Sequence, residues 1–326
     1  MTIFNSQRRQ QFLMETYFKA YKQHLSRGIE LWRKRLPHSD SEAEGRSLAS
    51  ASVASDRYEN LSIGYTAGQP IDPLRDELEQ VVAAYEVYQQ RLGEYEGEPQ
   101  FAPFNFAHEL ADYERCMQLI GLCYLLHRRD LLPRIARLQD PTYADEDTLY
   151  EELLGHALPD RADIDEWYHD EPYSTLIHAM YAQTPQEASA KLAEYCRQWY
   201  PAMADTPWHG GHERMTEDDG DYFGYWAFEA GAVALLYDID DSQIDHMVYP
   251  RDLVAFARGF KPEQVSTSVT RVAAGETCPQ NGWWHTPAQP GSRRHFKQGD
   301  TFPAIENSAY GATFWLWSPD QSSPSL

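Results

Sequence analysis

Apolar residues recur at helical spacing over most of the first 258 positions. Between Arg8 and Leu36 they are separated by three to five residues, and Pro37 ends the run. This period is typical of an amphipathic helix. Similar patterns predict helices from Pro73 to about Leu92 and from Phe106 to Leu132, and then at about 145–157, 172–182, 185–200, 220–237 and 250–258.

The helix boundaries are marked by residues with known preferences. Thr184 is followed by Pro185 and by Glu187, which predicts an N-cap, a proline in the first helical position and a carboxylate in the first turn. Residues 38–56 are rich in Ser, Ala and Glu without apolar periodicity, and this composition favours a mobile connection. Residues 94–103 are predicted to form a loop.

From about Val265 the pattern changes to short strands. The segments 265–273, 282–285, 294–297 and 312–317 are aromatic or β-branched and are separated by Gly and Pro, as in a small β module. The predicted fold is therefore mainly α, a helical bundle of two packed halves with a small C-terminal all-β module. We expect domains at 1–138 (N-terminal helical), 139–260 (acidic C-terminal helical) and 261–326 (β).

Composition excludes several classes of protein. With 42% hydrophobic residues, 9 Trp, 21 Tyr and 13 Phe, the 326-residue chain can bury a large core and is not disordered. Its net charge of −22 argues against direct binding of nucleic acid, which needs Lys and Arg. No apolar run approaches the roughly 20 residues of a membrane span. Four cysteines without metal spacing, and no signal peptide, favour a reduced, cytoplasmic protein.

The negative charge is concentrated in one segment. Residues 140–252 carry 26 Asp or Glu and five Lys or Arg, a net charge of −21, whereas residues 1–36 are at +6. The plainer interpretation is a solvated face that keeps the protein soluble. The alternative is a surface that attracts a basic partner and speeds association.

Sequence signatures of catalysis are absent. There is no phosphate-binding glycine motif and no nucleophile elbow. His209 and His212 flank two glycines, which disfavour the helix of a zinc site, and Asp238–Asp245 lacks the glycine and the final glutamate of a calcium loop. Asp218, Asp219 and Asp221 are most simply a solvated loop. These patterns predict a protein that is not an enzyme and has no cofactor or metal.

One stretch carries a long, specific motif. Residues 222–242 read YFGYWAFEAGAVALLYDIDDS and are followed by YPRDL at 249–253. This combination resembles the hallmark of the PoNi family, immunity proteins of PoNe-type DNase toxins that are often delivered by type VI secretion. Upstream matches at 61–72, 188–200, Trp208 and His212 follow in the family's order. The tail, with 275–284 and 296–303, is similar to a β module on other toxin-immunity proteins.

The motif residues are expected to hold the fold. A helix over 220–237 would place Tyr222, Tyr225, Trp226 and Glu229 on neighbouring turns of one buried stripe. A buried Glu229 needs a partner, and we expect an Arg or a Tyr hydroxyl from another helix. The structural set is Tyr222, Phe223, Gly224, Tyr225, Trp226, Phe228, Glu229, Asp240, Asp241, Ser242, Tyr249, Pro250, Asp252 and Leu253.

The resemblance implies an immunity protein that neutralises a cognate toxin nuclease by forming a stoichiometric complex. Toxin-binding candidates are the carboxylates and aromatic residues of two acidic loops, Asp160, Asp163, Asp165, Glu166, Trp167, Tyr168, Asp170 and Glu171 in one, and Trp208, Glu213, Glu217, Asp218, Asp219 and Asp221 in the other. Two alternatives stay open, a general DNA-mimic inhibitor of nucleases and a hydrolase that uses the His209/His212 and Asp218/Asp221 cluster. Homo-oligomerisation also stays open.

Overall fold

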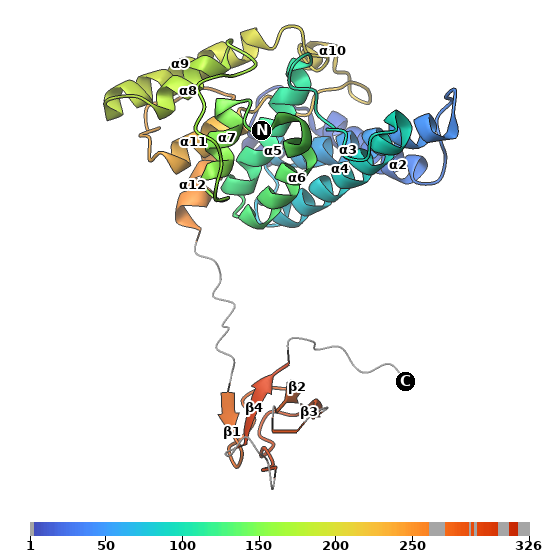
Figure 1. Ribbon diagram of the computed structural model, residues 1–326, viewed down its shortest axis with the longest axis vertical. Helices are drawn as coiled ribbons and strands as arrows, with labels where there is room; N and C mark the ends of the chain where they lie inside the picture. The colour runs from blue at the N-terminus through green and yellow to red at the C-terminus, as the bar shows by residue number, and fades with distance from the viewer. Residues whose placement is uncertain (1–2, 261–270, 287, 290–291, 306–312, 319–326) are drawn as a thin grey trace. The chain divides into compact units, whose positions relative to one another are not determined.

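The computed structural model describes residues 3–260, 271–286, 288–289, 292–305 and 313–318. The chain divides into two compact units, residues 1–260 and 261–326. The first unit is helical and the second holds a small sheet (Figure 1). The prediction of a mainly helical fold with a small C-terminal β module is confirmed. A further division of the helical part at residue 138 stays a prediction.

The N-terminal part of the helical unit is built from long helices. The short α1 (Ile3–Gln7) precedes α2 (Glu15–Trp32), α3 (Glu42–Thr66) and α4 (Leu74–Glu96), and α3 packs against both α2 and α4. The prediction of a mobile connection over residues 38–56 is wrong. Helix α3 begins at Glu42, and the side chain of its N-cap Ser41 accepts a hydrogen bond from the backbone N–H of Glu44 (3.1 Å). The small residues Gly45, Ala49 and Ala54 are buried. Small side chains at buried positions of a helix let the neighbouring helices approach closely.

Helix α5 (Leu110–Leu125) is the centre of the core. Nearly all of its residues from Tyr113 onward are buried, and it packs mainly against α11 (Phe228–Leu236). Gly121 makes this contact possible, because a Cβ atom there would lie 2.8 Å from the carbonyl carbon of Phe228. The 3₁₀ turn η1 (Arg129–Leu131), α6 (Leu132–Tyr143) and α7 (Thr148–Gly155) follow α5. The helix predicted from Phe106 to Leu132 therefore ends earlier, at Leu125, and Pro133 lies in the first turn of α6.

The acidic segment contributes five more helices, α8 (Tyr173–Met180), α9 (Pro185–Ala202), α10 (Gly211–Arg214), α11 and α12 (Arg251–Gly259). The predicted start of α9 is confirmed, since the Thr184 side chain accepts from the backbone N–H of Glu187 (3.2 Å). The helix predicted over 220–237 begins only at Phe228. Before it, residues 222–227 are not helical, and tertiary partners bind their backbone groups.

The second unit holds a four-stranded antiparallel sheet in the order β1-β4-β2-β3. The strands are β1 (Arg271–Ala273), β2 (Gly282–His285), β3 (Arg294–Phe296) and β4 (Phe314–Trp317). Its core is aromatic, with Trp284, Phe296, Phe302 and Trp315 buried together. The predicted strand residues 265–270 and 312 lie outside the described part of the chain.

Candidate functional site

The motif residues 222–227 form hydrogen bonds with the side chain of Gln10, which lies between α1 and α2. The Gln10 side-chain oxygen accepts from the Tyr222 hydroxyl (2.6 Å) and from the backbone N–H of Tyr225 (2.9 Å). Its amide nitrogen donates to the carbonyls of Tyr225 (2.6 Å) and Met247 (3.0 Å). A single buried side chain thus satisfies backbone groups that a helix would otherwise have paired. The sequence carries no signal for this role, because Gln10 stands in a polar run.

Gly224 allows the same segment to lie against α3. Its φ angle is +110°, and a Cβ atom would lie 2.1 Å from the Thr66 hydroxyl oxygen. That hydroxyl donates to the Phe223 carbonyl (2.9 Å) and accepts from the Trp226 indole N–H (2.8 Å). The glycine of the motif is therefore required by both backbone conformation and close approach.

Glu229 lies at the start of α11 with no exposed surface. The Tyr195 hydroxyl on α9 donates to its Oε1 atom (2.7 Å), which confirms the expected tyrosine partner from another helix. Burial raises the pKa of Glu229 to about 7, against the opposing effect of this hydrogen bond and of the nearby Trp199 indole. Its Oε2 atom has no hydrogen bond of ordinary geometry within the described residues.

A second buried carboxylate, Glu114 of α5, belongs to the same polar cluster. Burial raises the pKa of Glu114 to about 8; Arg115 opposes this shift, and the negative charge of Glu229 adds to it. The Gln118 amide donates to Glu114 and to the Trp226 carbonyl (2.7 Å), and so joins this carboxylate to the motif. Sequence reasoning missed Glu114. Its neighbours Asp112 and Arg115 make the start of this helix look solvent-exposed, so the sequence carries no clear signal of its burial.

The turn between α11 and α12 is held by the motif's aspartates. Asp240 accepts from the backbone N–H of Ser242 (3.0 Å), and Asp241 accepts from the Tyr249 hydroxyl (2.5 Å). Asp252 forms an ion pair with Arg9 (2.9 Å). Pro250 and Leu253 are buried. The aromatic motif residues, Glu229, Pro250 and Leu253 therefore lie in the core, whereas Asp240, Ser242 and Asp252 lie at exposed turns.

The first acidic loop, residues 156–172, is fixed to the core along its inner side. Arg161 pairs with Glu151 (2.6 Å) and Asp140 (2.9 Å). Thr148 donates from its backbone to the Glu166 carbonyl (2.8 Å). The backbone N–H of Tyr168 donates to the Asp147 carboxylate (3.1 Å). The outer side chains are exposed to solvent, namely Asp160, Asp163, Asp165, Glu166, Asp170 and Glu171.

The two aromatic candidates in this loop are half-buried. The Trp167 indole donates to Asp170 (2.8 Å), and its ring meets His178 edge-on at 6.3 Å. The Tyr168 hydroxyl donates to Glu146, while its ring lies against Phe106. Each ring is therefore held in place and keeps part of its surface in solvent.

The second acidic loop, residues 204–221, is held by other elements, namely the end of α9 and the motif segment. Trp208 is only 8% exposed and stacks on Trp199 at 5.4 Å, so it belongs to the core rather than to the surface. Asp221 pairs with Arg214 (2.5 Å). The remaining carboxylates of this loop point into solvent, at Glu213, Glu217, Asp218 and Asp219.

Comparison with known proteins identifies the acidic part of the helical unit. Residues 145–253 match the family model described as PoNe immunity proteins (PoNi), C-terminal. This segment is similar to the C-terminal region of PoNi proteins. The match confirms the resemblance inferred from the motif for these residues.

The PoNi segment contains all of the motif residues and both acidic loops. No curated protein matches the chain. A solved structure, that of protein PA2201 from Pseudomonas aeruginosa, is similar with a TM-score of 0.59 and 22% identity. That likeness covers 77% of this chain and 90% of the other, and it concerns the fold.

The histidines near the PoNi motif serve packing. His212 contacts the Tyr225 hydroxyl through Nδ1 (2.8 Å), and His209 stacks on Tyr200 at 4.3 Å. In the part of the chain that the structure describes, no group of three or more His, Cys, Asp or Glu side chains could hold a metal ion. None of the described helices is both long and apolar enough to cross a membrane.

Proposed function

We propose that this protein is an immunity protein that neutralises a cognate DNase toxin of the PoNe type by forming a one-to-one complex. The observation that supports the proposal most directly is the overlap of two segments of the chain, the one that matches the family and the one that carries the negative charge. The PoNi segment, residues 145–253, is almost the same stretch as residues 140–252, which hold a net charge of −21. The protein acts in the cytoplasm, where the DNA that it protects lies.

The acidic loops supply the binding surface in this proposal. A nuclease that binds DNA has a surface rich in Lys and Arg. Closely spaced carboxylates attract that basic surface and raise the association rate of the two proteins. The fixed inner side of residues 156–172 supports the proposal further. Because Arg161 and Tyr168 already hold the loop, binding need not order it, and the entropic cost of association falls.

The aromatic anchors of the interface are Trp167 and Tyr168. Both keep exposed ring surface beside exposed carboxylates, and buried aromatic side chains provide much of the affinity of protein interfaces. The charges thus govern how fast the complex forms, and these rings govern how slowly it dissociates.

A toxicity-rescue experiment tests the function. The toxin encoded beside this protein is expressed in a bacterial host with and without the full chain, and the pair is then co-purified. Growth rescue together with a stable one-to-one complex supports the proposal. Failure of both rescue and complex formation overturns it. Inhibition of several unrelated DNA-binding enzymes would instead favour a general DNA mimic.

Charge reversal tests the surface. We expect the pair Asp163→Lys and Asp165→Lys to slow association with the toxin at least about tenfold at low salt, without changing the far-ultraviolet circular dichroism. The matched control is Glu96→Lys with Glu98→Lys, which changes the net charge equally at the exposed end of α4. Equal association rates for the two double variants would contradict the role of the loop.

A further inference from the structure

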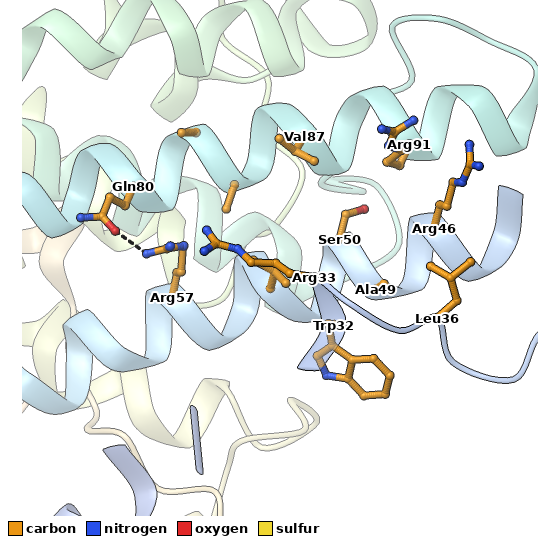
Figure 2. A pocket seen from close by; sticks show the side chains of 13 residues that line it. Trp32, Arg33, Leu36, Arg46, Ala49, Ser50, Arg57, Gln80, Val87 and Arg91 are labelled. Atoms are coloured by element: carbon orange, nitrogen blue, oxygen red, sulfur yellow. Dashed lines mark hydrogen bonds between the residues drawn. The ribbon is translucent and has the colours of Figure 1, made fainter. Parts of the chain in front are cut away.

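A groove on the helical unit carries the opposite charge to the acidic loops. It lies between α3 and α4, next to the C-terminal end of α2, and has a volume of about 570 Å³ (Figure 2). Three residues come from the end of α2 and the segment after it, Trp32, Arg33 and Leu36. None of the acidic loop residues lines it.

The two long helices contribute to the groove in the same pattern. Each presents residues at i, i+3, i+4, i+7 and i+11, which is one face of a helix. These are Arg46, Ala49, Ser50, Val53 and Arg57 on α3, and Gln80, Ala83, Ala84, Val87 and Arg91 on α4. Arg46 and Arg91 lie at one end and Arg57 and Gln80 at the other (Figure 2). Eleven residues of helix give a length of about 16 Å.

The floor between these ends is apolar and made of small side chains. Ala49 and Ala84 are buried, whereas Val87 is 50% exposed and Leu36 46% exposed. Alanines at the centre allow the backbone of another helix to approach closely, and the two half-exposed side chains offer apolar surface that would be removed from water. The floor is therefore suited to large apolar side chains from a bound helix.

At one end of the groove the charges are paired, since Arg46 forms an ion pair with Glu42 and Arg91 with Glu94 (2.7 Å). At the other end they are not neutralised. None of the 13 residues drawn around it is acidic. Among the residues that the structure describes, neither Arg33 nor Arg57 has a carboxylate within 4.0 Å. Arg57 instead donates to the neutral Gln80 side chain (2.5 Å). Burial and the positive charge of Arg33 lower the pKa of Arg57, against the opposing charge of Glu77, so an incoming anion would further relieve the repulsion between the two arginines.

We propose that this groove binds an amphipathic α-helix of a partner protein, with acidic residues at the end that lies over Arg33 and Arg57 and large apolar residues along the floor. The guanidinium groups of Arg33 and Arg57 can form charge-assisted hydrogen bonds with carboxylates on one turn of such a helix. A single-stranded nucleic acid fits less well, because the net charge of −22 repels a polyanion and the floor offers no aromatic stack along its length. The proposal is independent of toxin neutralisation, since different elements carry the two surfaces.

The test is a selection on the full chain. The probe is a displayed library of Ala-based 18-residue helices in which four end positions and two central positions vary. We expect enrichment of Asp or Glu at one end and of Leu, Ile or Phe at the centre. Absence of enrichment, or enrichment of Lys and Arg at that end, overturns the proposal.

Matched variants assign the binding to the groove. The most enriched peptide is labelled, and its affinity is measured by fluorescence anisotropy. Arg33→Ala with Arg57→Ala should weaken binding at least about fivefold, since two charge-assisted contacts are lost. Arg27→Ala with Arg35→Ala removes the same charge from exposed sites outside the groove and should change the affinity less than about twofold. Equal losses in the two double variants overturn the proposal.

Two further measurements separate other occupants and misfolding. Val87→Asp places a negative charge at a half-exposed position, so it should retain wild-type circular dichroism and abolish peptide binding. Sedimentation of the chain alone tests whether a second copy fills the groove. Concentration-dependent association that disappears in the Arg33/Arg57 variant would replace the partner helix with a second copy and overturn the proposal.

Discussion

Replacing Glu229 with Gln should remove a pH-dependent loss of stability. Glu229 is fully buried, and its pKa in the folded protein is about 7 against an ordinary value of 4.5. Because the folded state binds this proton more tightly than the unfolded state, the free energy of unfolding falls as pH rises from 4.5 to 7. At about 1.4 kcal/mol per pKa unit, the loss over the whole window is about 3 kcal/mol.

Glutamine keeps the shape of the side chain and cannot ionise. Its amide can donate to the Tyr195 oxygen, which lies 2.7 Å from Glu229 Oε1. The variant is therefore expected to fold and to keep a hydrogen bond with Tyr195. The free energy of unfolding of the variant should therefore not show the decrease that wild type shows between pH 4.5 and 7.

Urea unfolding followed by circular dichroism measures this difference at pH 5 and pH 8. Relative to wild type, Glu229→Gln should be about 2–3 kcal/mol more stable at pH 8 than at pH 5, the part of the window that these two pH values span. Glu96→Gln, at an exposed position, is the control and should show no such change. If the difference between Glu229→Gln and wild type is the same at both pH values, the carboxylate is not protonated in the folded protein and the reasoning is refuted.

Three other variants test the scaffold by urea unfolding. Arg161→Ala leaves Glu151, 1% exposed, without its ion pair and should cost about 3–5 kcal/mol; wild-type stability would mean that the pair does not hold the loop. Gly121→Ala should cost about 1–3 kcal/mol, because its Cβ meets the Phe228 backbone at 2.8 Å, and an unchanged midpoint would contradict that contact. Gln10→Ala leaves several buried groups unpaired and should cost at least about 2 kcal/mol; a smaller loss would mean that this amide does not hold residues 222–227.

Local patterns were sufficient for most of the helices and for the character of the surface. The apolar period of 3.6 residues predicts where α2, α4 and α9 lie, because it reports which side of a helix must leave water. Thr184 marks the start of α9, since its hydroxyl satisfies a free backbone N–H. The acidic segment and the motif of residues 222–253 can likewise be recognised from the order of residues alone, and the residues that match the family model include the motif.

The composition of residues 38–56 misled the sequence reasoning for a physical reason. Small and polar residues favour a loop when taken alone. In the folded protein the same small side chains of α3, such as Ala49 and Ala54, are what allow α2 and α4 to pack closely on both sides. The stability of that helix comes from its neighbours, which no local window contains.

Part of the candidate site could be predicted from the sequence, and part of it depends on tertiary contacts. The exposed carboxylates of residues 156–172 follow from composition, because charged side chains remain in water. The non-helical conformation of residues 222–227 depends on Gln10, which lies more than 200 residues away in the chain. The burial of Glu114 and the groove between α3 and α4 arise only where separate helices pack together. Sequence by itself thus determined the helical periods, the charge and the family motif. Tertiary structure alone decided which polar groups are buried and which grooves stay open, because burial is a property of contacts between distant segments.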